Sequence, residues 1–155
     1  MKEQMKKDIK SFQIIYSALI AGVAVFMLIT VYLNELGPGF ATEDDEGFTN
    51  LLLIVGFVFS IPSVYAGIFI FNKRTENIES KEIGEKIAIF RSAMIVRAAT
   101  VEGAAFFFTV VYLITGSLYG LVGGLAGLII LLWFFPSLGR LSNELKHNFD
   151  DLKYD

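Results

Sequence analysis

The stretch from Gly103 to Gly139 reads GAAFFFTVVYLITGSLYGLVGGLAGLIILLWFFPSLG and contains no charged side chain. A helix rises about 1.5 Å per residue, so as a single helix this stretch would extend roughly 55 Å. That is nearly twice the thickness of the hydrocarbon core of a bilayer, about 30 Å. Thr115, Gly116 and Ser117 divide the stretch, and glycine and serine favour turns. It therefore predicts two apolar helices joined as a hairpin across a membrane.

Two further uncharged runs precede it, Ser11 to Asn34 and Gly47 to Asn72, and each is long enough to cross a bilayer. The charged residues, 19% of the chain, are confined to blocks between these runs, and the mean hydropathy is +0.59. This pattern excludes a soluble enzyme, a disordered chain and a nucleic-acid-binding module. The sequence predicts an all-α, four-helix transmembrane bundle that forms one integral membrane domain over residues 1–155. The helices are expected at about 11–35, 48–72, 84–115 and 118–139.

The distribution of basic residues predicts the orientation of the helices. Of the 13 Lys and Arg residues, all but Arg97 lie in the N-terminal tail, the loop between the second and third helices, or the C-terminal tail. Lys and Arg are retained on the cytoplasmic side of membranes. We therefore expect both termini to be cytoplasmic in a multi-pass protein of a bacterial inner or plasma membrane.

Helical periodicity of apolar residues continues outside the membrane over residues 1–12, 83–94 and 138–152. Charged residues flank each of these apolar stripes, so the sequence predicts amphipathic extensions of the helices on the cytoplasmic side. Such extensions either pack together under the bundle or lie on the membrane surface. A third possibility is that they bind a cytoplasmic protein partner.

Glu102 is the acidic residue that the sequence places deepest in the membrane. It lies eleven residues beyond Arg91, about 16 Å deeper along a helix. An acidic group there costs a few kcal/mol, and such groups are functional candidates. We expect a protonated carboxyl at neutral pH. The carboxyl either carries protons in coupled transport or only hydrogen-bonds across helices.

The second helix offers partners for Glu102 at a matching depth. Ser60, Ser63 and Tyr65 carry hydroxyl groups, and Pro62 frees a backbone carbonyl by interrupting the helical hydrogen bonds. Small residues around Glu102 allow neighbouring helices to approach closely. The predicted ion-coupling candidates are therefore Glu102, Ser60, Ser63 and Tyr65, together with Arg97 as a residue that modulates Glu102.

Arg97 precedes Glu102 by five residues, which is about 140° of helix rotation, so the two side chains of one helix do not meet. One interpretation makes Arg97 an anchor at the cytoplasmic interface, where a long basic side chain reaches water. The other pairs Arg97 with Glu102 of a neighbouring subunit, which requires an oligomer.

The fourth helix contains two overlapping GxxxG pairs, Gly120 with Gly124 and Gly123 with Gly127. This spacing is typical of closely packed membrane helices. It does not distinguish contacts within one chain from contacts between chains. Together with the small residues near Glu102, it leads us to expect a homo-oligomer in the lipid bilayer.

The segment from Met94 to Ala105 resembles the carboxylate-bearing helix of the proteolipid (c-type) subunits of rotary ATP synthases. That resemblance implies a proton-binding role for Glu102. It covers a short part of the chain, and Arg97 is foreign to the pattern. The second helix lacks the repeated GxGxG of that family, and the loop lacks its Arg-Gln-Pro turn. We therefore make no family assignment.

Residues for other chemistry are scarce. The chain has no cysteine and one histidine, His147, which lies in the polar C-terminal stretch. We expect no catalytic residues, no metal site, no cofactor and no enzymatic activity. Two functions stay open: a proton- or ion-coupled transporter or channel subunit that uses Glu102, or a non-transporting accessory membrane protein that binds a partner through its cytoplasmic extensions.

Overall fold

The computed structural model describes residues 2–37 and 46–145, and the regular elements in these ranges are all helical. The all-α prediction is therefore confirmed. Three helices are long and apolar enough to cross a membrane, and a bent pair of shorter helices would be a fourth crossing. The elements are α1 (Lys2–Leu36), α2 (Glu46–Thr75), the 3-10 helix η1 (Ile78–Ser80), α3 (Ile83–Thr115), α4 (Leu118–Trp133) and α5 (Leu138–Leu145).

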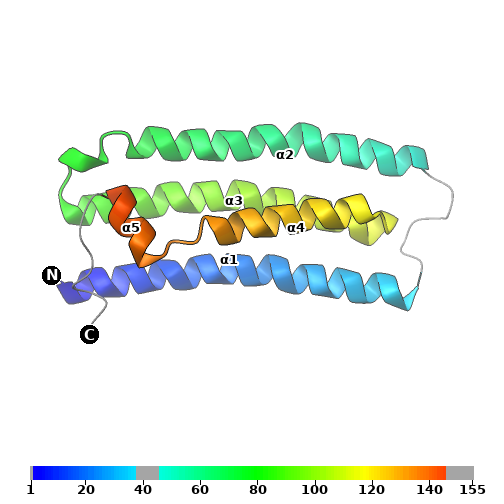
Figure 1. The fold of residues 1–155 in the computed structure, drawn as a ribbon, viewed down its shortest axis with the longest axis horizontal. Helices are drawn as coiled ribbons and strands as arrows, with labels where there is room; N and C mark the ends of the chain where they lie inside the picture. The colour runs from blue at the N-terminus through cyan, green and yellow to red at the C-terminus, as the bar shows by residue number, and fades with distance from the viewer. Residues whose placement is uncertain (1, 38–45, 146–155) are drawn as a thin grey trace.

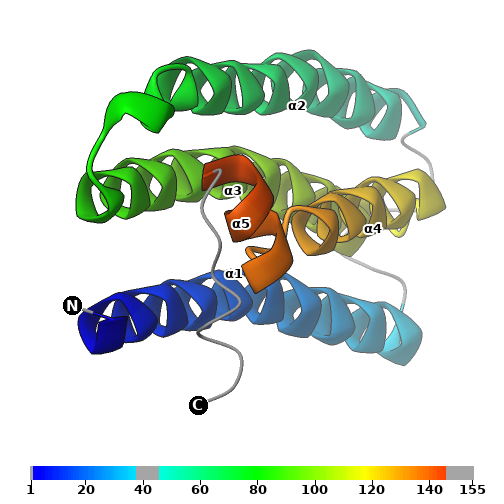
Figure 2. The same ribbon diagram turned by 60° about the vertical axis from the view of Figure 1, so that its left-hand side comes forward.

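Helix α3 is the centre of the molecule, and α1, α2 and α4 pack against it (Figures 1 and 2). Helix α4 also contacts α1, whereas α2 has few contacts with either of them. The start of α1, the end of α2, the start of α3 and the whole of α5 lie at one end of the bundle (Figure 1). We call this the α5 end.

The turn between α3 and α4 falls where the sequence predicted it. Helix α3 ends at Thr115, and Gly116 adopts the left-handed conformation with φ of 65°. Glycine adopts this conformation without a steric penalty and commonly ends a helix in this way. The Gly116 N–H donates to the carbonyl of Tyr112, and α4 begins at Leu118.

Two predicted helix limits were wrong. The first helix begins at Lys2 instead of residue 11, because the amphipathic extension continues directly into the apolar segment. The fourth ends at Trp133 instead of residue 139, and α5 follows at an angle of 69°. Pro136 is the cause, since proline has no N–H to donate and disfavours the helical conformation of the residue before it.

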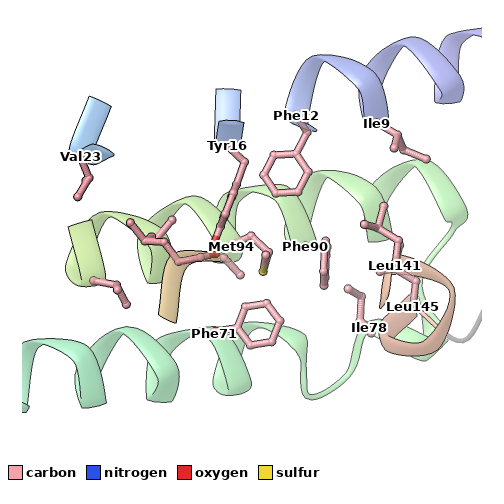
Figure 3. Packing of buried hydrophobic residues seen from close by; sticks show 14 of the residues in the cluster. Ile9, Phe12, Tyr16, Val23, Phe71, Ile78, Phe90, Met94, Leu141 and Leu145 are labelled. Carbon is pink, nitrogen blue, oxygen red and sulfur yellow. Dashed lines mark hydrogen bonds between the residues drawn. The ribbon is translucent and has the colours of Figure 1, made fainter. Parts of the chain in front are cut away.

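The amphipathic extensions pack against one another at the α5 end (Figure 3). Phe90 of α3 stands edge-on to Phe12 of α1, with ring centroids 6.5 Å apart, and to Phe71 of α2 at 5.7 Å. Leu141 and Leu145 of α5 join the same core and are no more than 1% exposed. The apolar stripes therefore form a common core as far as residue 145. Their continuation to residue 152, and His147, lie outside the described residues.

Many large apolar side chains of α2 are exposed, among them Ile54, Val58 and Phe69. Only Gly56, Gly67 and Phe71 of this helix are buried. Groups of exposed apolar side chains mark membrane or protein contacts. Such apolar helices are compatible with a small membrane protein.

Candidate functional site

Arg97 is the most deeply buried charged residue that the structure describes, with 5% of its surface exposed. Its guanidinium carbon lies 3.8 Å from the ring centroid of Phe71 and 4.0 Å from that of Phe134. Two aromatic rings therefore enclose the cation, an arrangement that stabilises a desolvated arginine. The structure places Arg97 inside the bundle, where it does not act as a surface anchor.

The end of α4 lies close to Arg97, which stacks on Phe134 directly after this helix. The last carbonyl groups of a helix have no partner within it, and the helix dipole makes this end negative. In α4 the carbonyl of Leu131 accepts a hydrogen bond of 3.2 Å from the Tyr16 hydroxyl. The carbonyl of Trp133 accepts one from Nη1 of Arg140. A side chain of α1 and one of α5 thus replace the hydrogen bonds that the helix loses.

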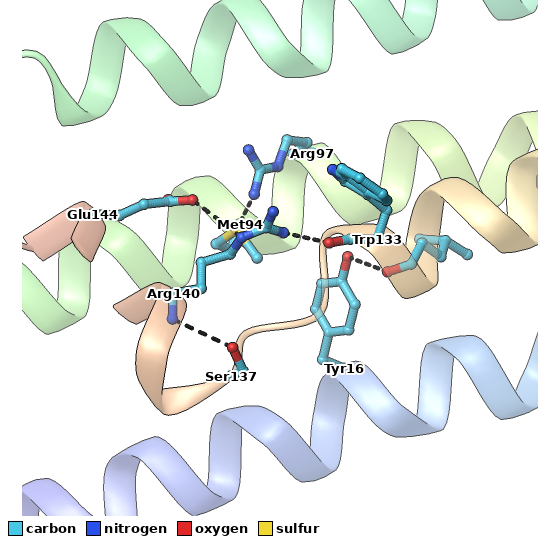
Figure 4. A network of polar contacts seen from close by, with 8 residues as sticks. Tyr16, Met94, Arg97, Trp133, Ser137, Arg140 and Glu144 are labelled. Atoms are coloured by element: carbon cyan, nitrogen blue, oxygen red, sulfur yellow. Dashed lines mark hydrogen bonds and ion pairs between the residues drawn. The ribbon is translucent and has the colours of Figure 1, made fainter. Parts of the chain in front are cut away.

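Gln13 of α1 adds a third contact, since its Nε2 donates to the carbonyl of Pro136 at 2.9 Å. We call Gln13, Tyr16, Arg97, Arg140 and Glu144 the Arg97 cluster. Figure 4 shows most of it, with side chains from α1, α3 and α5 converging on the break between α4 and α5. The cluster fixes the angle of α5 beneath the bundle.

The charges of the Arg97 cluster do not balance. Nε of Arg140 lies 3.5 Å from Oε1 of Glu144, the carboxylate of the described residues that faces both guanidinium groups. Nε of Arg97 and Oε2 of Glu144 are buried and have no hydrogen-bond partner in the part of the chain that the structure describes. Burial raises the pKa of the Glu144 carboxyl, while Arg97 and Arg140 oppose that rise.

Glu102 lies on a different side of α3 from the predicted partners. Thr100 packs directly on Gly67 of α2, and two residues correspond to about 200° of helix rotation. One turn after Glu102, Phe106 packs against Phe26 of α1 with ring centroids 5.3 Å apart. Glu102 therefore leaves α3 on the side of α1, half-exposed. Among the described residues none hydrogen-bonds or ion-pairs with its carboxylate.

The predicted group of Glu102 with Ser60, Ser63 and Tyr65 is not brought together. Ser60 and Ser63 line a cavity of about 450 Å³ between α2 and α3, and Tyr65 lines a second cavity and is 70% exposed. Glu102 lines neither cavity. The prediction matched depths along the helices, whereas the rotation of α3 about its own axis decides which side chains meet.

The four glycines of the GxxxG pairs face α3 of the same chain. A Cβ atom on Gly120 would lie 2.7 Å from the backbone nitrogen of Tyr112, and one on Gly127 would lie 2.6 Å from the Cβ of Ala105. Gly123 and Gly124 are similarly close to the side chains of Phe108 and Thr109. The structure thus uses this motif for the contact between α3 and α4.

Sequence reasoning missed Gln13, Tyr16, Arg140 and Glu144. The signal that could have found them is Pro136, since a helix that ends at the membrane edge leaves carbonyl groups in need of donors. Gln13 and Tyr16 are polar residues near the start of the first apolar run. Their pairing with α4 depends on how the two helices lie side by side.

The fold and the site define a small all-α protein with three or four apolar helices long enough to cross a membrane, held at one end by a buried arginine. No protein family, characterised protein or solved structure matches the chain.

Proposed function

We propose that this chain is a structural membrane protein that crosses the bilayer four times, with both termini in the cytoplasm, and does not transport ions. In this proposal it associates with a second copy of itself through the side of α3 that carries Glu102. The single observation that carries the proposal is the half-exposed Glu102, which has no partner among the described residues.

The cost of an unpaired carboxyl in lipid supports association through this side. Ionisable groups inside membranes pair with one another or with polar groups of neighbouring helices. Since its own chain gives Glu102 no such group in the described residues, a neighbouring chain is the natural source. Hydrogen bonds between membrane helices contribute about 1 kcal/mol each.

The surface beside Glu102 is suited to close helix contact. Ala99 and Gly103 lie between Glu102 and the cavity that Ser60 and Ser63 line, and both are exposed. A Cβ atom on Gly103 would meet nothing within 4 Å. Small exposed residues let two helix backbones approach in lipid. A second helix placed here would bring its own polar groups within reach of Glu102.

The alternative of docking a cytoplasmic partner through the apolar extensions has less support. Leu141 and Leu145 would be the apolar contacts of α5, and both are buried in the core of the chain itself. A partner could reach them only after α5 leaves the bundle.

The experiment compares Glu102→Leu, Glu102→Gln and Ala99→Leu by chemical cross-linking and by mass in lipid nanodiscs. We expect Glu102→Leu and Ala99→Leu to reduce the dimer fraction and Glu102→Gln to retain it, because a carboxamide still forms hydrogen bonds. Ala66→Leu is the matched control, since Ala66 is an exposed alanine on α2.

Proton flux into liposomes tests the competing function. A transporter in which Glu102 carries the proton would show flux in the wild type and lose it in Glu102→Gln. Such a result would overturn the proposal, and so would dimers that survive both Glu102→Leu and Ala99→Leu.

A further inference from the structure

A groove runs between α2 and α4 over the surface of α3. Its volume is about 360 Å³, it is open along one side, and its lining is almost entirely apolar. Representative lining residues are Ile61 and Ile68 of α2, Val101 of α3, and Ala126 and Ile130 of α4. Because α2 and α4 have few contacts with each other, α3 forms the floor of the groove.

The length of the groove matches one leaflet of a bilayer. Along α2 it extends from Phe57 to Ile68, a rise of roughly 16 Å. This is about half of the hydrocarbon thickness of about 30 Å. On α2 the groove lies near the middle of the helix, and Ile68 marks its end nearer the α5 end.

One end of the groove lies close to the buried Arg97. Ile68, Val101 and Ile130 line its end, and one helical turn further on the same three segments carry Phe71, Arg97 and Phe134. The end of the groove therefore lies one helical turn from a guanidinium group whose Nε has no hydrogen-bond partner in the described residues.

Further positive charge lies at the same place. The guanidinium carbon of Arg140 is 5.7 Å from the ring centroid of Phe134, so Arg97 and Arg140 both lie close to this ring. Among the described residues Glu144 is the acidic group that pairs with Arg140, so two guanidinium groups share one carboxyl group. Trp133, 73% exposed, lies beside this end, and tryptophan favours the headgroup region of membranes.

We propose that the groove binds one acyl chain of a phospholipid and that the Arg97 cluster holds its anionic headgroup. The apolar lining and the length of about one leaflet fit an acyl chain. The guanidinium groups of Arg97 and Arg140 near the end of the groove fit the negative charge of a phosphate. The proposal does not depend on self-association, because the groove lies between α2 and α4, away from the α1 side of α3 where Glu102 lies.

The experiment measures lipid retention by native mass spectrometry of the full chain, released from micelles supplied with phosphatidylglycerol or phosphatidylcholine. We expect phosphatidylglycerol to be retained in preference by about fivefold, the effect of one arginine near an anionic group. Arg140→Gln should abolish the preference, and Arg140→Lys should keep most of it.

Two variants test the groove itself. Ala126 is an exposed alanine that lines the groove, so Ala126→Phe should fill it and reduce retention of both lipids. Ala66→Phe adds the same volume outside the groove and should retain both lipids as the wild type does. Circular dichroism confirms that each variant is folded before its retention is compared.

Three results would overturn the proposal. Equal retention of the two lipids would exclude headgroup recognition, and full retention by Ala126→Phe would exclude the groove. Oleate that displaces phosphatidylglycerol at equal concentration would show that the site takes a single-chain fatty acid and not a phospholipid.

Discussion

Arg97 illustrates how a charge is accommodated in an apolar interior, since no carboxylate of the described residues forms an ion pair with it. The rings of Phe71 and Phe134 cover its two faces, and the negative end of α4 lies beside it. Because arginine is planar and weakly hydrated, it stacks in this way, whereas a lysine ammonium does not. The depth of Arg97 along the helix predicted a side chain that reaches water. Only the structure shows that this side chain is buried.

Replacing Arg97 by lysine should therefore destabilise the protein although the charge is retained. We expect a loss of about 1–3 kcal/mol in the free energy of unfolding, the cost of two desolvated cation–π contacts. Denaturant titration in mild detergent measures this loss. Arg91→Lys, two turns earlier on α3, is the matched control, and equal stabilities of the two variants would contradict the role assigned to the rings.

Glu144 makes the stability of the α5 end depend on pH. Burial raises the pKa of its carboxyl in the folded protein, so the folded state favours the protonated form. Stability is then greatest below the ordinary glutamate pKa and falls as pH rises through the raised value. Thermal unfolding between about pH 4 and about pH 7 should show this fall in the wild type.

Glu144→Gln should remove that pH dependence, because the amide does not titrate. The exposed residue Glu82 gives the control variant Glu82→Gln, which should keep the wild-type slope. A slope that is unchanged in Glu144→Gln would show that another group is responsible.

At the scale of helices, the glycines of α4 determine how closely it approaches α3. A methyl group on Gly120 would meet the backbone of Tyr112, which cannot turn aside as a side chain does. The spacing of the glycines indicated a close contact, but the sequence left open whether it lay within one chain. Only the path of the chain through Gly116 brings α4 onto α3.

Gly120→Ala should consequently force the two helices apart. We expect a loss of about 1–3 kcal/mol, the usual cost of overpacking, measured by the same denaturant titration. Gly22→Ala is the matched control, since a Cβ atom there would meet nothing within 4 Å and alanine favours the helix. A Gly120→Ala variant as stable as Gly22→Ala would contradict the close contact.

At the scale of the whole molecule, the α3–α4 turn lies at the end of the bundle opposite η1 (Figure 1). With four crossings, these two segments would lie on opposite sides of the membrane. The absence of cysteine makes this testable, because a single introduced thiol has no background.

We expect Ser117→Cys to react with a membrane-impermeant maleimide in intact cells. Ser80→Cys and Lys10→Cys should react only after the membrane is opened, because the basic segments are held in the cytoplasm. Labelling of all three variants from the same side would exclude the proposed crossings.

The sequence by itself determined the helical class, the turn at Gly116 and the apolar runs. These are local properties: uncharged length, glycine conformation and hydrophobic periodicity act within one segment. It also indicated that the apolar extensions are helical, as α1 and α3 are at their starts.

Only the tertiary structure decided that Arg97 lies between two rings, that Glu102 faces away from Ser60 and Ser63, and that α5 turns beneath the bundle. These outcomes depend on the rotation of α3 about its axis and on which groups replace the carbonyl partners lost at Pro136. Residues far apart in the chain, such as Tyr16 and Leu131, supply those partners, and no local pattern encodes their meeting.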